Sequence, residues 1–419
     1  MKPRVVILGG AGAMGRIAAR DLARAGRGAV RVVVADRVPS ATAMPGVETT
    51  PVDVADPRSL ARALRGAYAV IASLPYRYNL DAMRGALAAR AHYVDLGGLF
   101  HVTRQQLLLA PAFERQGLMA ILGMGSAPGI LNVLAARGAR DLDRVREVHC
   151  LVGAVDRTRF RNAPPLGFGY APDTLLDEFA MPSAVFRNGA FAMVPPLDPA
   201  ERIAVRFPDP VGTLQVDTTL HSEVATLPLH FADRGIREVT FRQGFDAEFM
   251  ARLEFLVRLG LVDTRPVPVR AARAGASRGA AGDGLRRAGR SAARPIDVAV
   301  SPRDVLLALL RRLPPAKPIG RPIRYEVLRT VVRGLRAGRT CTVTCDCHAG
   351  PRAGGGIGPD VDTGGPPSIA VQLMLGGELP IRPGVWAPEQ VVPVEPFVRE
   401  LERRGMRVTR RVQAGRARH

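Results

Sequence analysis

The chain has 419 residues, 47% of them hydrophobic, which is enough to bury a large core and predicts two or three domains. No apolar stretch reaches the length of a membrane span, no signal-peptide region precedes the first strand, and four cysteines do not make a disulfide framework, so we expect a cytoplasmic protein. The formal charge of +21 comes from three arginine-rich segments without interleaved aromatic residues, 265–294, 311–339 and 399–419, which argues against a specific nucleic-acid partner.

The first predicted element is a strand, because the four apolar residues 5–8 suit a parallel strand buried on both faces. Three glycines then follow in the order G-x-G-x-x-G, namely Gly10, Gly12 and Gly15. In such a turn one glycine permits the bend, the second lets the backbone approach a diphosphate, and the third lets the next helix pack closely. The helix that begins near Ala13 and Met14 offers free N–H groups and a positive dipole end to the phosphates.

A second apolar run, 30–35, ends in Asp36, 21 residues after Gly15. A carboxylate about 20 residues beyond the glycines is where a dinucleotide site binds the adenosine ribose. Asp36 favours NAD, because a carboxylate repels the 2′-phosphate of NADP, whereas Arg37 directly after it can accept that phosphate. We therefore predict NAD or NADP as the cofactor, with NAD slightly favoured, and place Asp53 near the same site at the end of the next strand.

Strand and helix patterns alternate through residues 1–138, which predicts an α/β protein with a Rossmann-type, doubly wound parallel sheet. Helices are expected over 57–65, 78–90 and 103–115. Right-handed crossovers place the carboxyl end of every strand on one edge, where an open α/β sheet binds its ligands. The segments expected at that edge are 10–15, Asp36, Asp53, 73–75, 95–98 and 123–129.

Near residue 140 the pattern becomes longer and more irregular, which predicts a second, mixed α/β domain over 139–355 that covers the cofactor. Within it, residues 265–294 are mainly Arg, Ala and Gly and are predicted to be a disordered insertion. Alternation places three cysteines on one buried face of a strand, Cys341, Cys345 and Cys347, so no metal site is predicted. Residues 356–419 are predicted to pack back on the first domain.

Four stretches, in this order along the chain, resemble the saccharopine dehydrogenase-like oxidoreductases: Gly10–Gly15, Tyr93–Asp95, Gly125–Gly129 and Gly384–Glu389. That group includes saccharopine reductases, lysine 6-dehydrogenases and carboxynorspermidine or homospermidine synthases. The resemblance covers residues 1–135 well and 365–419 moderately. It implies a Rossmann domain completed by the C-terminal segment, a central domain that holds the substrate, and hydride transfer between a nicotinamide cofactor and a carbon that bears an amine.

The same resemblance implies roles for individual residues. By this match Ser73 and Pro75 lie near the nicotinamide ribose, and Pro128 lies beside the ring. Asp95 falls where such a family can hold a substrate amine, although a loop carboxylate or helix cap is an equal alternative.

Oxidation of an amine needs a group that takes up a proton as hydride leaves. The two lysines, Lys2 at the first strand and Lys317 in a Pro-rich stretch, are poorly placed for this role. His221 and Glu223 put a base and a carboxylate within three residues, and a strand would send both to one face, although a polar loop is the alternative. Arg242 is a candidate partner for a substrate carboxylate, against a solvated role.

The leading hypothesis is an NAD(P)-dependent oxidoreductase that acts at a CH–NH group of an amino-acid-type substrate. The alternatives are a reductase of a C=C or C=O bond in a lipid-like substrate and a non-catalytic NAD(P)-binding sensor. An open cavity with His221 and Glu223 beside the nicotinamide would favour the enzyme, and a blocked cavity would favour the sensor. The partners expected are a small-molecule substrate and a second copy of the chain in a homodimer.

Overall fold

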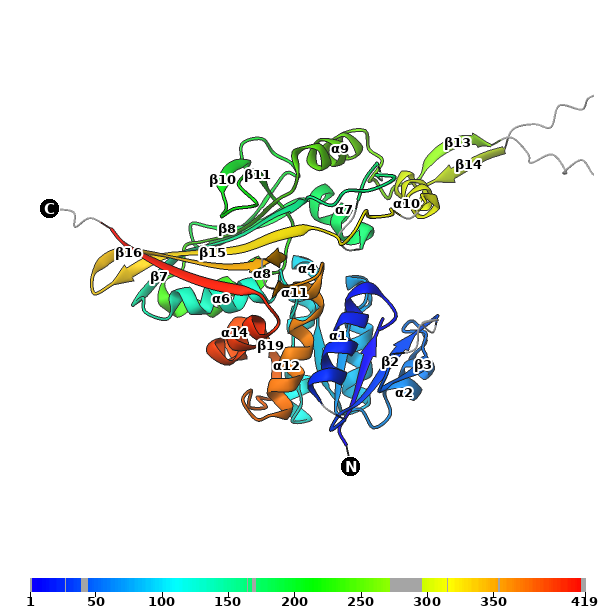
Figure 1. Cartoon of the computed structure of the whole chain (residues 1–419), viewed down its shortest axis with the longest axis horizontal. Coiled ribbons are helices and arrows are strands. Elements are labelled where there is room, and N and C mark those ends of the chain that lie inside the picture. Colours follow the sequence, from blue (N-terminus) through cyan, green and yellow to red (C-terminus); the bar gives the residue numbers. More distant parts are fainter. Residues whose placement is uncertain are drawn as a thin grey trace, which may run out of the picture.

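The computed structural model describes residues 2–26, 28–38, 44–163, 165–167, 171–271, 296–314, 316–352 and 355–415. Within these residues, the chain forms two large sheets with helices packed on each (Figure 1). The first sheet has seven strands, all parallel. In spatial order they are β19 (Gly384–Trp386), β6 (Met119–Ile121), β5 (His92–Asp95), β4 (Ala69–Ala72), β1 (Arg4–Leu8), β2 (Arg31–Asp36) and β3 (Val47–Pro51). The first six strands of the chain therefore have the order of a doubly wound dinucleotide-binding fold, as predicted.

The helices between these strands are α1 (Ala13–Ala25), α2 (Pro57–Leu64), α3 (Asn79–Ala88), α4 (Phe100–Leu107) and α5 (Ala110–Arg115), with a 3₁₀ turn at Tyr76–Tyr78. The single helix predicted over 103–115 is wrong, because the chain forms α4 and α5 instead. Pro111 explains the break: it has no N–H to donate and its ring excludes the preceding turn of a continuous helix.

The second sheet is mixed and contains nine strands in the described part of the chain. Its main path is β10 (Ile203–Arg206), β11 (Thr213–Thr218), β12 (Glu238–Gly244), β7 (Arg144–Asp156), β15 (Arg324–Arg336), β16 (Arg339–Ala349) and β20 (Arg407–Ala414), and β8 (Ser183–Arg187) and β9 (Ala190–Val194) join beside β12. Strands β12 and β7 are parallel, and the other pairs are antiparallel. Cys341, Cys345 and Cys347 lie buried along β16, as the alternation predicted.

Five helices accompany this sheet in the described residues: α6 (Ile130–Ala139), α7 (Pro172–Ala180), α8 (Glu223–His230), α9 (Ala247–Arg258) and α10 (Pro302–Arg312). A 3₁₀ turn occupies Ala232–Arg234, and two small hairpins pair β13 (Val267–Ala271) with β14 (Ile296–Val300) and β17 (Pro351–Arg352) with β18 (Gly355–Gly356). The β13–β14 hairpin extends away from both sheets (Figure 1). Most of the predicted insertion, 272–294, lies outside the described residues.

The C-terminal segment contributes to both sheets. Strand β19 adds to the first sheet beside β6, whereas the last strand, β20, pairs with β16 of the second sheet. The expectation that the whole of 356–419 packs on the first domain is therefore wrong for β20. The helices of this segment are α11 (Val361–Gly364), α12 (Pro366–Leu375), α13 (Pro388–Val391) and α14 (Val394–Arg403). Within the described residues, no helix combines the length and apolarity needed to cross a bilayer.

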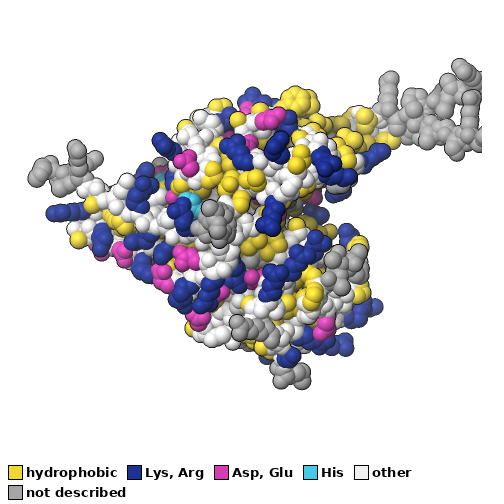
Figure 2. All heavy atoms as spheres, in the orientation of Figure 1, with side chains coloured by type: hydrophobic (Ala, Val, Ile, Leu, Met, Phe, Trp, Pro, Cys, Tyr) yellow, Lys and Arg dark blue, Asp and Glu magenta, His cyan; other side chains and the backbone are white. Residues whose placement is uncertain are grey.

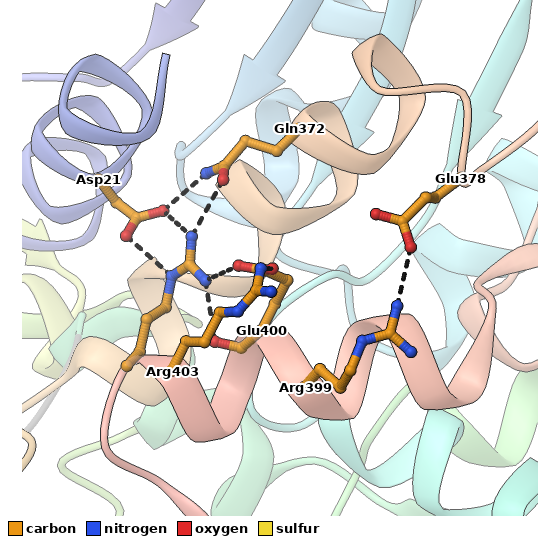
Figure 3. A network of polar contacts seen from close by, with 7 residues as sticks. Asp21, Gln372, Glu378, Arg399, Glu400 and Arg403 are labelled. Atoms are coloured by element: carbon orange, nitrogen blue, oxygen red, sulfur yellow. Dashed lines mark hydrogen bonds and ion pairs between the residues drawn. The ribbon is translucent and has the colours of Figure 1, made fainter. Parts of the chain in front are cut away.

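A polar network fastens the C-terminal helices to α1, the helix that follows the glycine turn (Figure 3). The guanidinium of Arg404 donates to both carboxylate oxygens of Asp21, each at 2.8 Å, and to Glu400 at 2.7 Å. Gln372 of α12 donates to the same Asp21 at 2.9 Å. The side chain of Arg404 is only 11% exposed, so loss of its charge would leave Asp21 poorly compensated.

We expect Arg404→Ala to lower the free energy of unfolding by about 2 kcal/mol, because it removes a partly buried bidentate pair. The matched control is Arg399→Ala in α14, the helix that ends directly before Arg404. The ion pair of Arg399 with Glu378 is about half exposed and should contribute less than about 1 kcal/mol. Urea unfolding followed by circular dichroism measures both values. Equal losses in the two variants would show that the Arg404 network does not fasten these helices.

Candidate functional site

The glycine turn after β1 is fixed by close backbone contacts. Gly9 has φ +69°, and a Cβ there would fall 2.1 Å from the carbonyl oxygen of Ser73. A Cβ on Gly15 would fall 2.5 Å from the carbonyl oxygen of Gly9, so α1 can pack this closely only with glycine. Gly10 is also confined, since its Cβ would meet Val34 at 2.8 Å.

Gly12 is different from these glycines. Its φ is −69°, which any residue adopts, and a Cβ there would contact only the Gly9 carbonyl oxygen, at 3.2 Å. The space in front of Gly12, Ala13 and Met14 belongs to a large cavity. Gly12 precedes α1 without a side chain to cap it, so the first N–H groups of the helix point to that space. This arrangement fits the diphosphate of a dinucleotide, because the missing side chain leaves room for it.

Asp36 ends β2 directly beside the turn, where its Oδ2 accepts a hydrogen bond from the backbone N–H of Ala11 at 3.1 Å. Arg37 is exposed next to it. Asp53 has a local contact instead: its Oδ1 accepts from the N–H of Ala55 at 3.0 Å in the turn before α2. The structure thus brings Asp36 to the glycine turn, whereas Asp53 is exposed at the end of the next strand; neither carboxylate is among the residues that line the cavity.

The cavity has a volume of about 1050 Å³ and lies between the carboxyl edge of the first sheet and the second sheet. Its lower wall includes the glycine turn and three further residues singled out in the sequence, Ser73, Pro75 and Pro128. Its upper wall comes from the ends of β7 and β12, the start of β15, α7, α9 and the loop before α11. A ligand held at the turn can therefore reach side chains of both sheets.

His221 stands in the wall of this cavity and is 6% exposed. Its ring stacks on Phe241 with centroids 3.8 Å apart and an angle of 9° between the planes. The Nδ1 atom hydrogen-bonds the carboxylate of Glu223, and Nε2 lies 3.8 Å from Oε1 of Glu178. Burial opposes protonation, but the charges of Glu223 and Glu178 and the hydrogen bond outweigh it, so the pKa of His221 is raised.

His221 and Glu223 hydrogen-bond each other, but their local structure differs from the strand that was expected. No strand is formed, because Glu223 begins α8 and His221 lies in the loop before it. Glu223 is fully buried behind the imidazole, so it orients His221 and does not reach the cavity itself.

Glu178 and Gln243 also line the cavity, and sequence reasoning missed both. The side-chain amide of Gln243 donates to Glu178 Oε2 at 2.8 Å, which holds that carboxylate near His221. One signal was available: Glu178 falls among Leu175, Leu176 and Phe179, on the apolar face of α7. An acid on such a face needs a buried partner.

Asp95 has a different position from the predicted one. It is fully buried, its Oδ1 accepts from the backbone N–H groups of Gly97 and Gly123, and its Oδ2 accepts from Gln106 at 2.7 Å. Burial raises its pKa in spite of these hydrogen bonds. Asp95 does not line the cavity, so it is not placed to contact a substrate amine. It has the alternative role, that of a carboxylate that holds two loops together.

Arg242 also lies elsewhere than predicted for a partner of a substrate carboxylate. It points away from the cavity, where its Nη1 donates to Thr240 at 2.8 Å and its Nε donates to the Glu201 carbonyl at 3.3 Å. The residues of a strand alternate between its faces, so Gln243 and not Arg242 reaches the cavity. The arginines that do line it are Arg157, Arg252 and Arg324.

Carboxyl groups gather on the side of the cavity formed by β15 and α11. Glu326, Asp360 and Asp362 all line it, and the side chains of Glu326 and Asp362 hydrogen-bond each other. Burial, and then the charge of Asp360, raise the pKa of Asp362 to about 6. Asp362 therefore changes its charge near pH 6, and its ionised form favours a cationic group on a ligand.

Comparisons with known proteins agree with this architecture. The family model described as the saccharopine dehydrogenase NADP binding domain matches residues 5–121, and that of the saccharopine dehydrogenase C-terminal domain matches residues 125–406. The structure of apo saccharopine dehydrogenase (L-Glu forming) from Saccharomyces cerevisiae matches with a TM-score of 0.68 and 19% identity, covering 98% of this chain and 100% of that one. At this identity, the match shows that the two chains share a fold.

Other solved structures match a small part of the chain. A putative exported protein from Burkholderia pseudomallei is 25% identical, with 23% of this chain and 48% of that chain covered and a TM-score of 0.20. Uronate dehydrogenase from Agrobacterium tumefaciens is 20% identical, with 23% and 40% covered and a TM-score of 0.20. These partial matches carry no argument about the site.

We expect Gly12→Val to weaken dinucleotide binding by about 100-fold or more, because its side chain would fill the space in front of α1. The fold should remain, with a loss of about 1 kcal/mol in unfolding free energy for a poor helix cap. Gly15→Ala is the control, since its Cβ meets backbone and should destabilise by about 1–3 kcal/mol. NADH fluorescence titration and thermal unfolding measure the two effects; undiminished affinity in Gly12→Val would exclude this binding site.

Proposed function

Because the chain belongs to the saccharopine dehydrogenase family of NAD(P)-dependent oxidoreductases, we propose that it transfers a hydride between the nicotinamide and a CH–NH group of an amino-acid-type substrate. The observation that carries the proposal is His221, a buried imidazole held by two carboxylates in the wall of a cavity that begins at the glycine turn. The cytoplasmic location and the homodimer expected from the sequence stay predictions.

The first sheet supplies the residues that would hold the cofactor. The N–H groups that follow Gly12 would bind the diphosphate, and Asp36 would accept from the ribose hydroxyls. Ser73 and Pro128 line the same cavity farther along the sheet edge, where the nicotinamide end would lie. The bound cofactor supplies the hydride acceptor or donor.

His221 would accept the proton that leaves the amine nitrogen. When an amine is oxidised, its carbon loses a hydride and its nitrogen loses a proton, and a C=N bond forms. His221 lines the cavity and would take that proton on Nε2, while Glu223 on Nδ1 would stabilise the resulting imidazolium. Because its pKa is raised, His221 is a strong enough base near neutral pH and can return the proton when the reaction runs toward the amine.

The charges of the cavity wall support an amine substrate. Among the described lining residues, seven carboxyl groups stand against three arginines, although the whole chain has a formal charge of +21. Figure 2 shows that Lys and Arg side chains are spread over the visible face and do not gather in one patch. A concave wall with an excess of carboxyl groups attracts positive charge, so an ammonium group would be favoured there.

The other two hypotheses fit less well. A lipid-like substrate would remove water from the charged side chains of the cavity and would offer them no hydrogen-bond partner or counter-charge. This desolvation costs free energy. A sensor without catalysis would not need a base aimed into an open cavity, and the cavity of about 1050 Å³ is not blocked by side chains.

We expect Asp36→Ala to weaken NAD binding about 10-fold and to change NADP binding much less, because the carboxylate binds ribose hydroxyls but repels a 2′-phosphate. Arg37→Ala is the matched control and should weaken NADP more than NAD. Isothermal titration with both cofactors measures these values. Equal losses for NAD and NADP in Asp36→Ala would place this carboxylate away from the ribose.

The proposed reaction is tested by following NADH or NADPH absorbance while the purified protein is offered lysine, saccharopine and polyamine precursors. We expect turnover of at least one amine, and His221→Gln should lower kcat by about 10²–10⁴-fold without loss of cofactor affinity. His230→Gln, at the far end of α8, is the control and should leave kcat unchanged. Full activity in His221→Gln would exclude the imidazole as the proton acceptor.

A further inference from the structure

Exposed apolar side chains are concentrated in one part of the chain. Of the 18 large hydrophobic residues that are exposed in the described structure, ten lie between residues 255 and 323. Single apolar residues scattered over a surface are ordinary, whereas a concentration of them marks a contact face. Six of the ten belong to the β13–β14 hairpin and to α10 with its last turn, and we call them the apolar face: Val267, Val269, Val298, Val305, Leu309 and Leu313.

On the hairpin, the apolar side chains share one side. Val267 pairs with Val300 and Val269 pairs with Val298, and residues directly opposite each other in an antiparallel pair point to the same side. The three valines of the apolar face are each at least 40% exposed. The hairpin extends away from both sheets (Figure 1), and Figure 2 shows hydrophobic side chains at its base on the visible face. A two-stranded hairpin is only marginally stable in water, so a surface that covers this side would stabilise it.

Helix α10, which a single residue separates from β14, is apolar on two sides. Its inner side packs with α7 and α9 in one buried cluster, through Leu306, Leu307 and Leu310. On its outer side, Val305 and Leu309 lie one turn apart and are 42% and 56% exposed. A helix that faces only water on its outer side normally carries polar residues there. The outer side of α10 therefore has the composition of a second contact surface.

The exposed charges around the apolar face are mainly basic. Where the structure describes side chains between residues 255 and 323, one exposed residue is acidic, Asp304, and six are basic: Arg258, Arg265, Arg311, Arg312, Lys317 and Arg321. The first three of the six form ion pairs with carboxylates at 2.6, 2.7 and 4.0 Å. The other three, in or shortly after α10, form none within the described chain, so their positive charge is not compensated.

This combination fits an anionic lipid surface better than a second copy of the chain. In a dimer with two-fold symmetry the same surface patch meets itself, so uncompensated basic groups would face each other. At a bilayer surface, apolar side chains enter the boundary of the acyl chains, and Lys and Arg bind the phosphate head groups.

We propose that the β13–β14 hairpin and α10 form a docking face for the surface of an anionic phospholipid bilayer. None of the six residues of the apolar face lines the cavity, so this face is separate from the site of the proposed reaction. The proposal does not depend on that reaction, and its test needs no substrate.

The test is sedimentation of the purified full chain with vesicles of phosphatidylcholine that contain about one third phosphatidylglycerol. We expect binding to these vesicles and at least about 10-fold weaker binding to phosphatidylcholine alone, because the basic groups then lose their counter-charge. Raising NaCl from about 0.1 M to about 0.5 M should also weaken binding, because salt screens exposed charges.

Leu309→Asp and Val269→Asp change the apolar face on two separate elements. Each should weaken vesicle binding about 10-fold or more, because the apolar side chain no longer enters the bilayer. Thermal unfolding checks that the fold is kept. The matched control is Leu108→Asp, since Leu108 is 78% exposed at the end of α4, outside the apolar face, and this variant should bind like the unchanged protein.

The basic groups are tested by Arg312→Glu, which should weaken binding to the anionic vesicles about 10-fold. Arg399→Glu makes the same change of charge in α14, on a different part of the molecule (Figure 1), and should have a much smaller effect. Equal effects of the two variants would mean that only the net charge of the chain matters and would overturn the proposal.

Two further outcomes would also overturn it. One is the absence of vesicle binding, or an equal loss in Leu309→Asp and Leu108→Asp. The other is a dimer, detected by analytical ultracentrifugation, that Leu309→Asp and Val269→Asp dissociate, because a second copy would then cover the apolar face. Losses of vesicle binding in these two variants with an unchanged sedimentation coefficient would support docking to the bilayer.

Discussion

The backbone contacts at Gly9 and Gly15 leave no room for a side chain, and the site takes its shape from them. They hold the start of α1 against the end of β1 and bring the carbonyl of Ser73 next to the turn. The helix N-terminus, the carboxylate of Asp36 and the neighbouring strand ends are thereby set at one edge of the sheet. The second sheet then needs only to cover that edge to enclose a cavity with two chemically different walls.

The two walls of the cavity differ in the charge of the groups that they present. The wall of the first sheet offers N–H groups and a helix dipole to phosphates, whereas the opposite wall offers carboxyl groups and an imidazole. The basic character of the whole chain has little influence here, because exposed arginines are screened by solvent and each arginine that lines the cavity pairs with a carboxylate. Burial raises the pKa of Asp362 in this wall to about 6, so its charge changes close to neutral pH.

The sequence predicts local features well and long-range ones poorly. The glycine turn and the alternation of strands and helices in the first sheet follow from neighbours within a few residues. Arg242 was misplaced because alternation shows that Arg242 and Gln243 face opposite sides but not which side is the cavity. Glu178 was missed because it lies 43 residues before His221. Asp95 could be assigned only once the loops around it were known to donate to its carboxylate.

The path of the C-terminal segment has a consequence for how the molecule assembles. Strand β19 lies at one edge of the first sheet and β20 lies at one edge of the second. During synthesis on the ribosome, β6 and β16 therefore lack a hydrogen-bonded neighbour on one side until residues 384–414 have emerged. Both sheets gain an edge strand within the same stretch of about 30 residues, so one part of synthesis completes the pairing of β6 and of β16.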